Sequence, residues 1–71
     1  MKCVAVCQDE FVVRTLHRAL ASSLDLEFVV EDRSLARRLH DAGVKARVAD
    51  PRRVDCYLKA DVTPATCLII E

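Results

Sequence analysis

Four short strand-like segments, three of them apolar runs and one at residues 44–49 weakly alternating, are separated by stretches of helical periodicity, and this restricts the chain to very few folds. The first run covers residues 2–7 and is unbroken, which is typical of a strand buried on both faces of a parallel sheet. Further strands are predicted over residues 26–31, 44–49 and 66–70. With a helix between each pair of strands, the order β-α-β-α-β-α-β implies a parallel sheet with right-handed crossovers.

The first two helices are predicted from the spacing of apolar residues and from their caps. The first helix covers residues 9–24, where apolar positions recur at helical spacing. The second starts at Asp32 or Ser34, either of which can cap it. It ends at Gly43, because glycine adopts the left-handed conformation at the least cost.

A third helix is predicted to start at Asp50 and Pro51, since an acceptor at the cap followed by proline marks a helix N-terminus. Its inward side would carry Val54, Tyr57 and Leu58. The strands would then take the order 3-2-1-4. The predicted fold class is α/β, a three-layer Rossmann-like half domain of about four parallel strands with helices on both faces. We expect residues 1–71 to form this single domain and to be the N-terminal part of a larger protein.

The composition excludes several classes of protein. Lys plus Arg and Asp plus Glu are equal at 11 each, so the basic surplus of nucleic-acid-binding proteins is missing. With 52% hydrophobic residues among 71, the chain has the content of one small ordered domain. No apolar run approaches the roughly 20 residues of a membrane-spanning helix, and the N-terminus has no signal-peptide pattern. We therefore expect a cytoplasmic protein without direct membrane insertion.

The cysteines and histidines form no recognisable site in the sequence. Cys3, Cys7, Cys56 and Cys67 contain no C-x-x-C pair and match no zinc module, so no metal site is predicted. We interpret all four as inert, buried thiols of a reducing compartment. Catalysis needs a nucleophile or base with an orienting partner, and no such set can be assembled around either histidine. We therefore expect no enzyme activity within these residues.

The turn between the first strand and the first helix contains no glycine. In a dinucleotide-binding βαβ unit this turn carries G-x-G-x-x-G, whose glycines allow a tight turn and a close approach of the backbone to pyrophosphate. Cys7, Asp9 and Val12 occupy these slots here. Asp9 places a carboxylate where phosphates would lie, and its residue type favours capping of the helix over a ligand role. Binding of NAD or ATP is therefore expected to be weak or lost.

Several segments together resemble the TrkA-N domain, also called RCK or KTN, the regulator of potassium conductance. They are residues 28–33 (Phe-Val-Val-Glu-Asp-Arg), 43–44 (Gly-Val), 49–50 (Ala-Asp) and 62–70 (Val-Thr-Pro-Ala-Thr-Cys-Leu-Ile-Ile). The resemblance covers nearly the whole chain. It implies a fold that binds NAD(H), ATP or related nucleotides, works as a dimer or larger ring, and gates potassium channels or transporters.

The resemblance also implies roles for two carboxylates. Asp32 falls on the acidic position after the second strand and would contact the adenosine ribose, while Asp50 would lie near the adenine side of the same crevice. From the residues alone, Asp32 can equally cap the second helix, and without the glycine turn capping is favoured. Arg33 remains open between gripping a phosphate and lying on a solvated helix face.

Two functions remain open at this point. The first is a regulatory or docking domain of a larger cytoplasmic protein, linked by resemblance to potassium transport. Its partners would be a second copy of the chain and neighbouring domains of the same protein. The second is an N-terminal accessory domain of an enzyme such as a DHH-type phosphoesterase, another setting in which such domains occur, with catalysis outside these residues.

Overall fold

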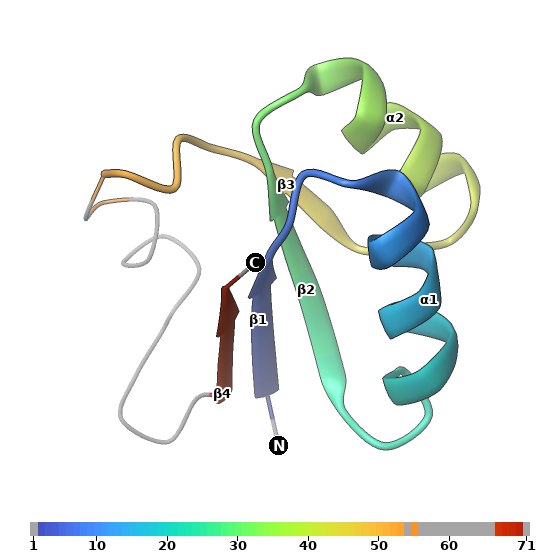
Figure 1. Cartoon of the computed structure of the whole chain (residues 1–71). Helices are drawn as coiled ribbons and strands as arrows, with labels where there is room; N and C mark the ends of the chain where they lie inside the picture. Colours follow the sequence, from blue (N-terminus) through green and yellow to red (C-terminus); the bar gives the residue numbers. More distant parts are fainter. Residues whose placement is uncertain (1, 54, 56–66, 71) are drawn as a thin grey trace.

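The chain folds around a parallel sheet with the strand order β3-β2-β1-β4. The computed structural model describes residues 2–53, 55 and 67–70. Its elements, in chain order, are β1 (Lys2–Val6), α1 (Glu10–Leu20), β2 (Asp25–Val30), α2 (Arg33–Asp41), β3 (Ala46–Val48) and β4 (Cys67–Ile70). The predicted α/β class and the order 3-2-1-4 are confirmed (Figure 1).

The main core lies between the sheet and the two helices, which cover the same face (Figure 1). The strand residues that reach into it are Cys3, Ala5, Leu26, Phe28, Val30 and Ala46, and the helix residues are Val13, Leu35, Ala36 and Leu39. Val4, Val6 and Val29 form a smaller buried cluster on the opposite face. The helix predicted for that face falls on residues that are mostly outside the described ones, so the two described helices occupy one face only.

The first helix is shorter than its apolar spacing predicts. It ends at Leu20, and the N–H groups of Ser23 and Leu24 both donate to the Leu20 carbonyl in a turn, at 3.0 and 2.9 Å. Leu24 still packs against the core. Its side chain is therefore partly buried, as the spacing predicts, although the helix has already ended. Spacing reports which side chains are buried, and a tight turn can bury the same side chain as a helix.

The second helix ends as predicted. Gly43 has φ +79°, and its N–H donates to the His40 carbonyl at 3.0 Å. The N–H of Val44 donates to the Leu39 carbonyl at 2.8 Å, which completes a Schellman motif. The chain thereby reverses directly into β3 and buries Val44.

The predicted start of the third helix at Pro51 is wrong. Residues 51–53 form a turn, in which the Arg53 N–H donates to the Asp50 carbonyl at 3.1 Å. The Asp50 carboxylate accepts the Arg52 N–H at 2.9 Å, the bond that a capping residue makes, and its two oxygens also bind the Arg52 side chain. Two arginines in a first helical turn would oppose the helix dipole. The residues predicted to face inward, Val54, Tyr57 and Leu58, lie outside the described part of the chain.

Candidate site at the carboxyl edge of the sheet

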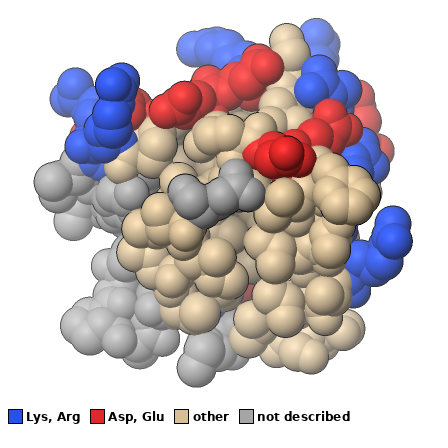
Figure 2. All heavy atoms as spheres, viewed as in Figure 1, with Lys and Arg blue, Asp and Glu red and all other residues tan. Residues whose placement is uncertain are grey.

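The carboxyl ends of the parallel strands meet at one edge of the sheet, and acidic residues gather there. Asp9 follows β1, Glu31 and Asp32 follow β2, and Asp50 follows β3. Figure 2 shows acidic side chains along this edge, at the top of the view, with basic side chains on either side. Open α/β sheets bind ligands outside this edge, at the point where the connections leave in opposite directions. Here that point lies between β1 and β4.

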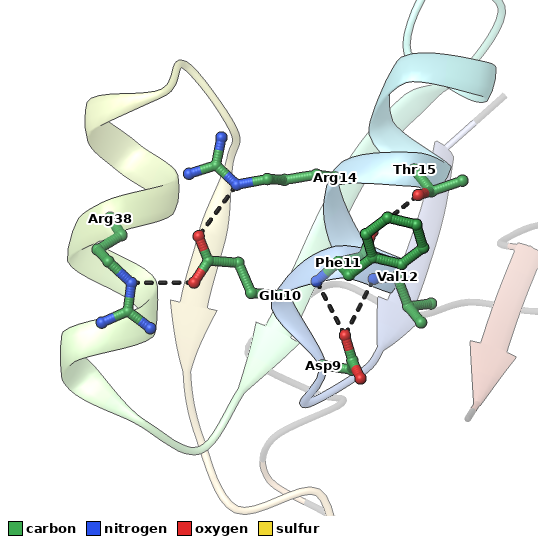
Figure 3. A network of polar contacts seen from close by, with 7 residues as sticks. All are labelled: Asp9, Glu10, Phe11, Val12, Arg14, Thr15 and Arg38. Carbon is green, nitrogen blue, oxygen red and sulfur yellow. Dashed lines mark hydrogen bonds and ion pairs between the residues drawn. The ribbon is translucent and has the colours of Figure 1, made fainter.

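Asp9 caps α1 with its own carboxylate (Figure 3). Its Oδ1 accepts the N–H of Phe11 at 2.9 Å and the N–H of Val12 at 3.2 Å. These are first-turn N–H groups of the kind that a dinucleotide-binding domain offers to pyrophosphate. The capping role predicted for Asp9 is thus confirmed, and an internal anion occupies the position of an external one.

The other two glycine slots are used for packing. Cys7 is buried, and its N–H donates to the Val29 carbonyl at 3.2 Å, which extends the bonding of β1 to β2 beyond the strand end. Val12 is half-buried against the main core. Both side chains fill space that glycines would leave free, so the turn is fixed by apolar contacts and by the cap.

Gln8 ties this turn to the neighbouring strand, a role that the sequence did not reveal. Its Oε1 accepts the N–H of Glu31 at 2.7 Å. The bond joins the turn after β1 to the residue after β2, across the edge where a ligand would approach. A single glutamine in a loop has no sequence signature for such a contact.

Glu10 joins the two helices at the same end of the molecule (Figure 3). Its carboxylate accepts Nε of Arg14 and Nε of Arg38, both at 3.0 Å. The hydrogen bond from Arg38, with that from Arg14, lowers the pKa of Glu10. The spacing of Glu10 and Arg14 signals a helical ion pair, whereas the contact with Arg38 depends on how α1 and α2 pack.

Asp32 caps α2, and Arg33 lies exposed on the first turn of that helix. The Asp32 Oδ1 accepts the N–H of Ser34 at 2.8 Å. The capping alternative weighed for Asp32 is therefore confirmed.

A hollow of about 330 Å³ lies at the carboxyl ends of β2 and β3. Its lining residues are Glu31, Val48, Ala49, Asp50 and Arg52. The two Asp50 oxygens accept Nε and Nη2 of Arg52 at 3.0 and 3.1 Å, and these bonds lower the pKa of Asp50. Of the predicted site residues only Asp50 lines this hollow, so the structure does not bring the six together into one pocket.

Among residues 2–53, 55 and 67–70, no cluster of three or more His, Cys, Asp or Glu side chains is arranged to hold a metal ion. None of the helices in the same residues is long and apolar enough to cross a membrane.

Comparison of the chain with protein-family models, with curated proteins and with solved structures finds no match. The function must therefore be argued from the geometry of the carboxyl edge itself.

Proposed function

We propose that the chain is a regulatory or docking domain that has the nucleotide-site architecture but no grip on phosphate. The cap on α1 carries this proposal, because Asp9 satisfies two of the N–H groups that would hold a pyrophosphate. A phosphate at the same place would have to displace Asp9 and would then meet its negative charge. The helix dipole that favours an anion is already used by the protein.

The surroundings of the cap support the same proposal. The bond between Gln8 and Glu31 holds the turn in place, and Glu10 is held by two arginines. Both of these arginine charges are thus directed at a carboxylate of the protein. The domain would act through contacts with a neighbouring domain or a second copy, in a reducing cytoplasm. Its resemblance to the TrkA-N domain makes control of potassium transport the process to examine first.

Titration calorimetry with NAD⁺, NADH, NADP⁺, NADPH, ATP and AMP tests the proposal. We expect no saturable binding below about 1 mM ligand, an affinity of about −4 kcal/mol or weaker. A dissociation constant in the low micromolar range for any of these ligands would contradict the proposal. A known dinucleotide-binding domain measured in the same buffer is the positive control.

If a nucleotide does bind, two variants separate the ribose position from the phosphate position. Asp32→Ala should weaken binding more than Asp9→Ala, because Asp32 stands at the ribose position of such domains. The opposite order would place the ligand at the α1 N-terminus.

A further inference from the structure

Two cysteines that lie at opposite ends of the sequence are neighbours in the sheet. The parallel register of β1 and β4 puts Cys3 directly opposite Cys67. Side chains at paired positions of adjacent strands point to the same face, and the strands lie about 4.8 Å apart. Disulfides form across Cα separations of about 4.4 to 6.8 Å, so the spacing of neighbouring strands lies within the range that a disulfide can bridge.

The two thiols differ in their surroundings. Cys3 is fully buried in the main core, whereas Cys67, on an edge strand of the described sheet, is only half-buried, so the prediction of a buried thiol is wrong for Cys67. Burial, together with a hydrogen bond to the Cys67 side chain, raises the pKa of the Cys3 thiol to about 11. Cys3 therefore keeps its proton at neutral pH, and Cys67 is the thiol that a soluble oxidant reaches first.

We propose that Cys3 and Cys67 are a peroxide-sensitive thiol pair that closes to a reversible disulfide between β1 and β4. In the first step the Cys67 sulfur attacks one oxygen of hydrogen peroxide, the O–O bond breaks, and a sulfenic acid and one water form. In the second step the Cys3 thiol gives up its proton as its sulfur attacks the sulfenic sulfur. The S–O bond breaks, and the hydroxyl leaves as a second water with the Cys3 proton. The two thiols lose two electrons in total, and the peroxide gains them.

The disulfide would fasten the edge strand to the centre of the sheet. β4 has four residues and, among the described strands, pairs only with β1. A covalent link at its first residue would hold it in register with Cys3. Since one of the two sulfurs lies near solvent, cellular thiols can reduce the bond again, as expected of a cytoplasmic disulfide that forms only transiently. This inference does not depend on the proposed loss of nucleotide binding.

Cys7 provides a matched control. It is buried like Cys3 and belongs to the same core cluster, but it lies four residues further along the chain. That spacing corresponds to about 13 Å of extended strand, which is beyond the reach of a disulfide with Cys67.

The test treats the reduced, desalted full chain with hydrogen peroxide at low protein concentration and measures intact mass and a tryptic map without reduction. We expect a loss of about 2 Da, the mass of two hydrogens, and a link between the peptides that carry Cys3 and Cys67. Dithiothreitol should restore the original mass. Because Cys3 and Cys7 share one tryptic peptide, Cys7→Ser must retain the link, whereas Cys3→Ser and Cys67→Ser must each lose it.

Other results would overturn the proposal. They are a link that survives in Cys3→Ser, a link to Cys56, oxidation of Cys67 to the sulfinic acid without any disulfide, or cross-linking only between chains. If Cys3→Ser fails to fold, Cys3→Ala and the half-exposed Cys67→Ser give the same comparison. Each fold is checked by circular dichroism before the oxidation.

Discussion

At the scale of single residues, Asp9 shows how a side chain can replace a bound anion at a helix N-terminus. Its Oδ1 satisfies two N–H groups at the start of α1 from within the chain. A glycine turn leaves such groups for a ligand, whose binding then stabilises the folded state. Here that stabilisation is built into the sequence and does not depend on any ligand concentration.

Replacement of Asp9 should therefore destabilise the protein. We expect Asp9→Ala to lower the free energy of unfolding by about 1 kcal/mol, the usual effect of removing an N-cap acceptor. Asp9→Asn keeps an acceptor oxygen and should lower it much less. Urea denaturation followed by circular dichroism measures both. Equal effects of the two variants would mean that the charge rather than the cap matters.

Cys3 makes the stability of the protein sensitive to alkaline pH. Its pKa is raised from 9.0 to about 11 in the folded state, mainly by burial. Between these two values the unfolded chain releases the thiol proton and the folded chain keeps it, so the free energy of unfolding falls as the pH rises. The full effect is on the order of 2 kcal/mol.

A comparison of wild type with Cys3→Ala isolates this effect, because all other groups that titrate at alkaline pH are common to both. Denaturation midpoints measured between pH 8 and about 11, with a reducing agent present, should converge as wild type loses its advantage. A constant difference across this range would show that the folded state does not hold the proton on Cys3.

At the scale of elements, the sequence predicts best where periodicity, caps and turn residues agree. The strand β1, the cap at Asp9 and the Gly43 terminus of α2 were all predicted because each depends on a few neighbouring residues. The start at Pro51 was wrong although Asp50 accepts the Arg52 N–H as a cap does, because residues 51–53 form a turn, and Arg52 and Arg53 would oppose the dipole of a helix starting there. A capping bond at one residue therefore does not by itself fix where a helix begins.

Contacts between elements could not be predicted from the sequence, for a different reason. The pairing of Cys3 with Cys67 and of Glu10 with Arg38 depends on strand register and helix packing. A prediction of strand order places β1 beside β4, yet a slip of one residue would turn Cys67 to the other face. Of the candidate site, the sequence predicts the capping carboxylates. It does not predict the hydrogen bond between Gln8 and Glu31.

At the scale of the whole molecule, the edge of the sheet formed by β4 is the surface best suited to a second copy. Leu68 and Ile70 remain 41% and 62% exposed, on the face of the sheet opposite the two helices. Among the described residues, Figure 2 shows mainly uncharged side chains below the acidic rim, and Phe11 of α1 is 77% exposed. Identical copies repel one another where they carry like charge, and the described residues of β4 carry none. Apolar strand edges without charge pair with other chains.

We therefore predict a two-fold dimer that joins the β4 strands of two copies in an antiparallel pair. Sedimentation equilibrium at about 50 µM protein should give the dimer mass for wild type, in the range where weak interfaces are populated. Ile70→Lys should give the monomer, because it places a charge at the end of the pairing edge. Phe11→Lys is the matched control on α1 and should leave the dimer intact if the strand edge forms the interface. Loss of the dimer in Phe11→Lys alone would assign the interface to α1, and a monomeric wild type would contradict the prediction altogether.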